Sequence, residues 1–234
     1  MIMESQRKQL AVAIDTSTDI AGLALVQDCE VLAELTWRAG QNHTVELLPN
    51  LCYLLSETGL SVQSAGCIVV AIGPGSYNGL RAGISAAKGL ALGLGIPIVG
   101  IGTLEAAAYQ HAGTGLPVCA ILNAGRGEIA AAIYQMKREW QQLVAEHTTT
   151  VEGLSSRIVT RTVFCGELGP SIAAKLEKEL KRKAVLPSPA ACLRRAGFLA
   201  ELGLKRFSVG DYDDPATLQP LYFRGPSITK AKHR

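Results

Sequence analysis

Short apolar runs separated by polar turns dominate the first part of the chain. Residues 10–14, 20–26 and 31–37 are rich in β-branched and other apolar side chains, and the polar gap at 27–30 has the length of a hairpin turn. The pattern therefore predicts three successive strands with short connections. The same strand–turn–strand opening recurs at 117–146. This repetition indicates two lobes of similar topology.

A helix with an unusually wide apolar stripe is predicted next. Thr44 is expected to cap a helix over 44–57, Pro49 to kink it and Gly59 to end it. The helix carries two neighbouring apolar rows, which are Val45, Leu48, Cys52 and Leu55 in one row and Leu47, Leu51 and Leu54 in the other. This stripe is wider than one buried helix face needs.

A glycine-rich segment, Gly73-Pro-Gly-Ser-Tyr-Asn-Gly-Leu-Arg81, is the most distinctive stretch of the sequence. It joins a buried strand at 67–72 to a helix over 81–94, and Gly79, Gly83 and Ala87 recur there at every fourth position. Each glycine costs a helix about 1 kcal/mol relative to alanine, so this row predicts a closely approaching backbone. A strand, a turn and a helix N-terminus can also direct backbone N–H groups at an anion.

Candidate phosphate-binding residues lie in two turns, which contain Asp15, Thr16 and Ser17 and then Gly73, Gly75 and Ser76. These groups could surround the phosphates of ATP or ADP, although the same residue types also satisfy a tight turn. The glycine spacing fits neither common phosphate-loop template, and Pro74 stands where a nucleophile elbow needs glycine. We therefore expect no catalytic residue here. The spacing of His43, Asp15 and Ser76 does not by itself argue for a catalytic triad.

The rest of the chain predicts a second α/β lobe. We expect an N-terminal lobe at 1–102 and a C-terminal lobe at 103–234, each a mixed sheet with helices. Thr103 is expected to cap a helix that starts at Leu104. The further elements predicted are strands at 117–122, 128–136, 140–146 and 163–165, helices at 171–181 and 190–202, a polar loop at 211–215 and an extended end at 218–224.

Composition excludes several classes of protein. Hydrophobic residues make up 48% of the 234 residues, as in a globular protein with a large core. The six cysteines form no CxxC motif, and the four histidines form no pair four residues apart, so we expect no metal site and no disulfide framework. No apolar run has the length of a membrane span, and residues 1–9 lack an apolar signal core. We therefore expect a cytoplasmic protein.

Charge is distributed unevenly. Residues 1–174 contain 10 Lys/Arg and 14 Asp/Glu, whereas residues 175–234 contain 13 and 6. The basic end includes 181–183 and the tail at 230–234. It is either a solvated helix face with a frayed terminus or part of a surface for a polyanion such as RNA.

Several of these segments together resemble the TsaB (YeaZ) family. The resemblance rests on the glycine-rich segment and on Ala13-Ile-Asp-Thr-Ser17, Ala86-Ala-Lys-Gly-Leu-Ala91, Gly95-Ile-Pro-Ile98, Thr103-Leu-Glu105 and Pro220-Leu-Tyr-Phe-Arg224. It extends from about Leu10 to Arg224. It implies a two-lobed actin/Hsp70/sugar-kinase-like (ribonuclease H-like) fold.

The resemblance also implies a role in tRNA modification. Members of this family are similar to TsaD, the metal-dependent subunit that transfers threonylcarbamoyl to N6 of adenosine 37 in tRNA (t6A37). A TsaB-like chain is implied to be a non-catalytic dimerisation partner of TsaD, with the ATPase TsaE completing the complex, tRNA bound indirectly, and a homodimer formed when the chain is alone. Here Asn78 replaces the usual threonine, and Asn123 replaces an aspartate of the second-lobe turn. The second change weakens the case for a nucleotide site closed by both lobes.

The family's dimerisation surface implies an interface on the 44–57 and 81–94 helices. The matching residues are Leu48, Leu51, Cys52, Leu55, Arg81, Gly83, Ala87 and Leu90. Alternatively, both helix faces are covered within the monomer. Two other functions stay open: a stand-alone ATP-binding enzyme of the actin-like class that uses Asp15, Thr16 and Ser76, and an RNA-binding role for the basic end.

Overall fold

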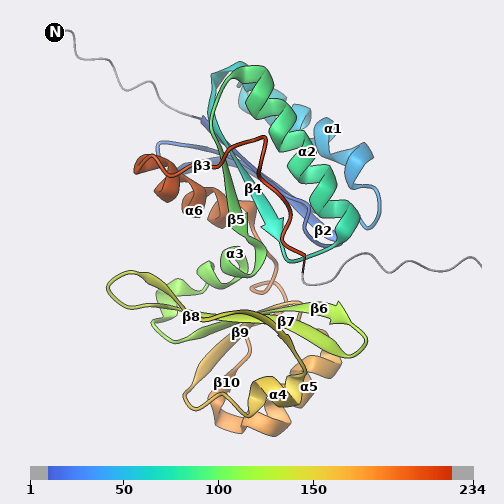
Figure 1. Ribbon diagram of the computed structural model, residues 1–234, viewed down its shortest axis with the longest axis vertical. Coiled ribbons are helices and arrows are strands. Elements are labelled where there is room, and N and C mark those ends of the chain that lie inside the picture. Colours follow the sequence, from blue (N-terminus) through green and yellow to red (C-terminus); the bar gives the residue numbers. More distant parts are fainter. Residues whose placement is uncertain (1–9, 223–234) are drawn as a thin grey trace, which may run out of the picture.

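The computed structural model describes residues 10–222, and these form two lobes that each contain a five-stranded mixed sheet (Figure 1). The first sheet has the order β3-β2-β1-β4-β5, in which β1 pairs antiparallel with β2 and parallel with β4. The predicted opening of three strands is confirmed. The elements of this part are β1 (Leu10–Asp15), β2 (Ile20–Gln27), β3 (Glu30–Arg38), α1 (His43–Thr58), β4 (Ala65–Gly73), α2 (Tyr77–Leu94) and β5 (Ile98–Gly102).

The second sheet repeats this topology. Its order is β10-β9-β6-β7-β8, and β6 pairs antiparallel with β7 and parallel with β9. The predicted recurrence of the strand–turn–strand opening is therefore confirmed. The elements are α3 (Thr103–Tyr109), β6 (Val118–Gly125), β7 (Glu128–Met136), β8 (Trp140–Thr149), α4 (Val151–Ser155), β9 (Thr162–Gly166), α5 (Pro170–Leu180) and β10 (Ala184–Val185).

Helix α6 (Ala196–Ser208) returns the chain to the first lobe. Its buried Leu199 and Leu202 join the core that includes Ala11, Ala13 and Val69 of the first sheet. The helix expected at 190–202 was placed too early, because turns stabilised by Ser188 and its neighbours occupy the stretch before Arg195. Our division of the chain at 102/103 does not provide for this return.

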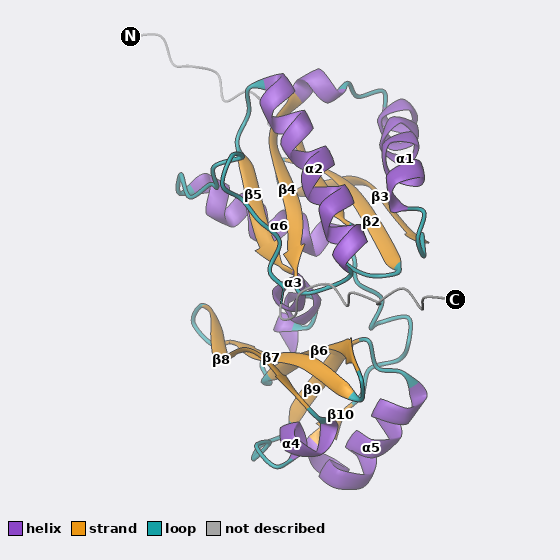
Figure 2. Cartoon of the chain, turned by 45° about the vertical axis from the view of Figure 1, so that its right-hand side comes forward, coloured by secondary structure: helices purple, strands orange, loops and turns teal. Residues whose placement is uncertain are grey.

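Helices cover both faces of the first sheet, with α1 and α2 on one face and α6 on the other (Figure 2). Successive side chains of a strand point to opposite faces. In β1, Leu10, Val12 and Ile14 accordingly pack under α1 and α2, whereas Ala11 and Ala13 pack under α6. A strand buried on both faces has no polar face, which explains the uninterrupted apolar run at 10–14.

The starts of three helices differ from the predictions. Asn42 rather than Thr44 is the N-cap of α1, and that helix continues through Pro49 to Thr58. Helix α2 begins four residues before Arg81, because the Ser76 side chain accepts a hydrogen bond from the Gly79 N–H (3.3 Å) and caps it. Thr103 is the buried first residue of α3 and caps nothing.

The glycine row of α2 packs against the 15–18 turn of the same chain. A β-carbon at Gly79 would overlap the Thr16 carbonyl oxygen, and one at Gly83 would overlap the Thr16 hydroxyl. The Thr16 hydroxyl donates a hydrogen bond to the Gly79 carbonyl (2.7 Å), and the Ser76 N–H donates to the Ser17 carbonyl (2.6 Å). The predicted close approach to this helix is therefore made from within the chain.

This contact gives a test with a matched control in the same helix. Gly79→Ala should lower the free energy of unfolding by about 1–3 kcal/mol, because the new methyl group meets backbone that cannot move aside. Gly89→Ala should raise it by about 0.5–1 kcal/mol, because nothing lies within 4 Å of a β-carbon there. Urea unfolding of both variants measures this. Equal effects would contradict the packing described.

Candidate functional site

The residues proposed for phosphate binding lie together at the end of the first sheet. The 15–18 turn follows β1 and the glycine-rich turn follows β4, and these two strands are parallel neighbours. The carboxyl ends of parallel strands are where open α/β sheets usually bind ligands. This end of the sheet faces the second lobe (Figure 1).

Asp15 is buried and fully engaged. One carboxylate oxygen accepts hydrogen bonds from the Ser17 N–H (2.9 Å) and from the Ser17 hydroxyl (2.6 Å). The other oxygen is paired with the Arg194 guanidinium at 2.6 Å. The side chain therefore has a cation and two donors without any ligand.

Arg194 is the residue of this site that the sequence analysis missed. It lies between β10 of the second sheet and α6, it is buried, and it also donates hydrogen bonds to the Ser17 hydroxyl (3.2 Å) and the Thr18 hydroxyl (3.0 Å). A single arginine beside apolar residues was the one available signal. Nothing in the sequence separates it from Arg195, which is exposed and pairs with Glu34 on the surface.

The charges explain why this buried carboxylate is stable. Burial alone would raise the pKa of Asp15, but the positive charge of Arg194 and hydrogen bonds from Arg194 and Ser17 outweigh that effect. The pKa of Asp15 is therefore below its usual value. Asp15 is ionised, and Arg194 neutralises it from within the chain.

The glycine-rich turn is engaged in the same way. The Ser76 N–H and hydroxyl both serve the chain itself, through the Ser17 carbonyl and the N-terminus of α2. A β-carbon at Gly75 would overlap the Ser17 carbonyl, and one at Gly73, which has φ 111°, would meet the Leu221 carbonyl. The glycines thus allow close packing. These residues do not fit a metal–nucleotide bound at Asp15.

His43 and Asn123 have structural surroundings as well. The buried His43 ring lies 2.8 Å from the Thr18 carbonyl and supports the 15–18 turn, while Asp15 faces Arg194. No His43–Asp15–Ser76 triad is formed. In the second lobe, the exposed Asn123 accepts a hydrogen bond from Gly125, and its N–H donates to Glu167.

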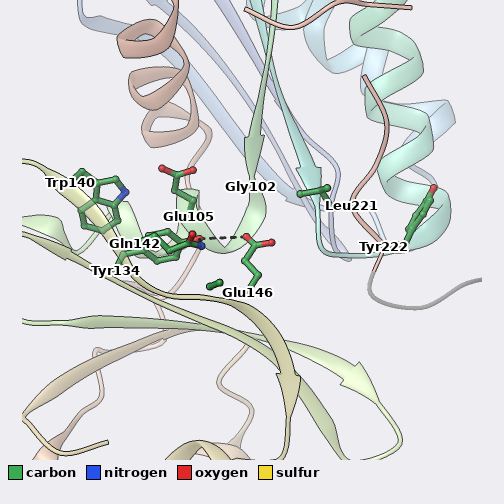
Figure 3. Close-up of a pocket in the computed structure, with 9 residues that line it drawn as sticks. Gly102, Glu105, Tyr134, Trp140, Gln142, Glu146, Leu221 and Tyr222 are labelled. Atoms are coloured by element: carbon green, nitrogen blue, oxygen red, sulfur yellow. Dashed lines mark hydrogen bonds between the residues drawn. The ribbon is translucent and has the colours of Figure 1, made fainter. Parts of the chain in front are cut away.

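A second pocket, of about 560 Å³, lies between the lobes (Figure 3). Glu105 from α3 and Glu146 from β8 line it together with Tyr134 and Trp140, whose rings are stacked 5.5 Å apart. The Tyr134 hydroxyl donates to Glu146 at 3.4 Å and accepts from Gln142. The sequence analysis assigned no role to these residues, because they come from three separate elements.

The two carboxyl groups of this pocket destabilise each other. Burial raises the pKa of both Glu105 and Glu146, and the negative charge of Glu105 raises that of Glu146 further. Burial also raises the pKa of the Tyr134 hydroxyl. The pocket is therefore an acidic cavity whose ionised form is costly near neutral pH.

The expected interface helices present a partly different surface from the one predicted. Leu51, Leu55, Gly83 and Ala87 are buried within the chain, so the prediction is corrected at these four positions. Leu48, Cys52 and Arg81 are exposed, and Leu90 is half-buried. Arg81 lies over the Tyr77 ring at 4.0 Å and donates to the Tyr222 hydroxyl (3.2 Å).

A groove of about 500 Å³ separates α1 from α2 on this side. Its walls include Thr44, Leu48, Ala82, Ser85 and Ala86. Large apolar side chains on the two helices are exposed: Val45 (71%), Leu48 (48%), Tyr53 (55%) and Leu92 (68%). Monomeric surfaces rarely collect such residues in one region, so this face is a candidate docking surface.

Two of the sequence-based exclusions concern metals and membranes. Among residues 10–222, no group of three or more His, Cys, Asp or Glu side chains is arranged to hold a metal ion. None of the helices in that range is both long and apolar enough to cross a lipid bilayer. Arg224 and the basic tail at 230–234 lie outside the described residues.

Solved structures define the class of fold. YeaZ from Pseudomonas aeruginosa superposes with a TM-score of 0.75 at 22% identity, covering 91% of this chain and all of that one. The ROK hexokinase from Thermus thermophilus gives 0.54 at 11% identity, covering 86% of this chain and 100% of the hexokinase. The chain is a two-lobed α/β protein of the actin-like and sugar-kinase class, as predicted.

Sequence comparisons define the family. The family model "TsaD: tRNA N6-adenosine threonylcarbamoyltransferase" matches residues 37–160. TsaB from Bacillus subtilis is 38% identical over 126 residues (54% of this chain, 55% of the relative), and TsaB from Escherichia coli is 35% identical over 127 (53% and 54%). These matches span about half the length of each relative; TsaB from Haemophilus influenzae is 26% identical over 91% of this chain and 92% of its own. The chain belongs to the TsaB family.

The acidic pocket predicts a pH-dependent stability. Because folding raises the pKa values of Glu105 and Glu146, the folded state binds more protons than the unfolded state above about pH 4.3, and stability falls as pH rises through the folded pKa values. Glu146→Gln should therefore raise the free energy of unfolding by on the order of 1 kcal/mol at pH 8 and by less at pH 5.

Urea unfolding at the two pH values measures this effect. Glu139→Gln, at an exposed position, is the control and should leave the pH dependence unchanged. A Glu146→Gln variant that follows the wild-type pH dependence would show that the two carboxyl groups are not coupled.

Proposed function

We propose that this chain is a non-catalytic scaffold subunit of tRNA N6-threonylcarbamoyladenosine synthesis, which binds and supports a TsaD-type transferase. Two named relatives, from B. subtilis and E. coli, are tRNA threonylcarbamoyladenosine biosynthesis proteins. The observation that carries the proposal for this chain is the exposed apolar surface of α1 and α2. We infer that the transferase docks there, and that the chain forms a homodimer through the same surface when alone.

The exposed face of α2 supports docking by a second helix. Ser85, Gly89 and Gly93 are exposed at every fourth position, and a β-carbon at either glycine would have nothing within 4 Å. Since packing within the chain does not explain these two glycines, their cost to the helix of about 1 kcal/mol each is consistent with an outside helix that approaches closely. The adjacent Leu92 and Leu48 supply apolar contact area.

The inner surface of the lobes supports a role without catalysis. Asp15 is neutralised by Arg194, and the groups of Ser76 are engaged within the chain. The alternative of an ATP-using enzyme at this site gains no supporting observation. In the proposed complex, chemistry belongs to the TsaD-type subunit, a TsaE-type ATPase joins it, and tRNA contacts the assembly indirectly.

Replacement of exposed residues of the α1–α2 face should abolish association. Leu48→Glu places a charge in the groove, and Gly89→Leu fills the stripe, so each should weaken binding to a TsaD-type transferase at least about 100-fold. Sedimentation and light scattering of the mixed chains measure this. Thermal unfolding should show both variants folded, because neither position is buried.

A matched variant on the second lobe provides the control. Leu143 is a leucine of similar exposure (43%) on β8, and Leu143→Glu should bind as the wild type does. Bulky residues at Gly83 are unsuitable for this test, because they would overlap Thr16 and disturb the fold. Unchanged association of both Leu48→Glu and Gly89→Leu would refute the proposed docking surface.

A further inference from the structure

Arg194 connects segments that are far apart in the sequence. It lies on the strand-free stretch that leads from β10 in the second sheet to α6 on the first, and its ion-pair partner Asp15 is 179 positions away. Both side chains are more than nine-tenths buried, at 7% and 6% exposed. The guanidinium thus lies where the chain passes back from one lobe to the other.

The contacts of Arg194 use the geometry of a guanidinium. Its Nε donates to Asp15 (2.6 Å), while one Nη donates to the hydroxyls of Ser17 (3.2 Å) and Thr18 (3.0 Å) and lies 3.5 Å from the Ile20 carbonyl. A lysine ammonium is a point charge and cannot reach these separated acceptors at once. The acceptors therefore form a site that is specific for a planar, forked cation.

The surrounding cavity is the gap between the lobes. Arg194 lines a cavity of about 560 Å³ together with Thr18, Asp19 and Arg38 of the first lobe and Glu167 of the second. The carboxyl end of β1 opens into this cavity. A metal–nucleotide that entered here would have to bring a cation to Asp15, where a cation is already present.

We infer that Arg194 is an internal counter-ion that closes the Asp15 site to metal–nucleotides and fastens the return segment to the first lobe. In place of a ligand that binds and leaves, the chain supplies the positive charge permanently. The same contact fixes the path of the chain between the second sheet and α6. This role is independent of where a partner docks, so its test is separate from that of the proposed function.

The test compares variants at Arg194 and at its neighbour. Arg194→Ala leaves a buried carboxylate unpaired, so its unfolding equilibrium constant should rise more than 100-fold. Methylguanidinium at about 10 mM should restore part of this loss, because it supplies the missing fork, whereas sodium chloride at equal ionic strength should not. Arg195→Ala, which removes an exposed arginine, should show a small loss and no response to methylguanidinium.

A second variant keeps the test decisive if Arg194→Ala does not fold. Asp15→Asn combined with Arg194→Met removes both charges and should unfold far less readily than either single variant. Single and double variants with additive effects would overturn the inferred pairing. So would an Arg194→Ala protein that folds as stably as the wild type or gains nothing from methylguanidinium.

Nucleotide exclusion is measured by calorimetry. Mg-ATP titrated into the wild-type chain should give no binding heat. Micromolar binding that Asp15→Asn abolishes would overturn the inference, because the carboxylate would then be available to a ligand despite Arg194. This result would leave the α1–α2 docking surface untouched, so the two proposals can fail separately.

Discussion

The backbone contact between the 15–18 turn and the first half of α2 holds the functional parts of this protein in place. Gly79 and Gly83 bring the helix so close to Thr16 that hydrogen bonds join the two segments directly. On its other side, the same turn is held by Arg194 from the segment that returns from the second lobe. One turn of four residues therefore connects β1, α2 and the path between the lobes.

This constraint separates the inner and outer surfaces of the protein. The inner end of the sheet, where related folds bind ligands, is satisfied by groups of the chain itself. The outer face of α2 keeps exposed glycines and apolar side chains that no part of the described chain covers. Loss of ligand chemistry in the cleft and availability of the outer face are thus two consequences of one packing arrangement, which suits a protein whose role is to bind another.

The sequence predicts the strands and the glycine-rich turn well, because short apolar runs and glycine spacing are local signals. It does not predict which face of α2 is covered. Helical spacing shows that Gly79, Gly83 and Ala87 share a face, but whether Thr16 or a partner meets that face depends on contacts across 60 or more residues. The row at Ser85, Gly89 and Gly93 was missed for the same reason. Arg194 and the Glu105–Glu146 pair lie further beyond local reasoning, since each is brought to its partner by the return or crossing of the chain between lobes.

The central claim is that this chain acts through its outer helices and not through chemistry in its cleft. The most direct test is threonylcarbamoylation of tRNA by a reconstituted mixture of a TsaD-type transferase, a TsaE-type ATPase and this chain. We expect wild-type chain and the double variant Asp15→Asn/Arg194→Met to stimulate the reaction equally, and Leu48→Glu to give no stimulation. Loss of stimulation in the folded double variant, with full stimulation by Leu48→Glu, would contradict the claim.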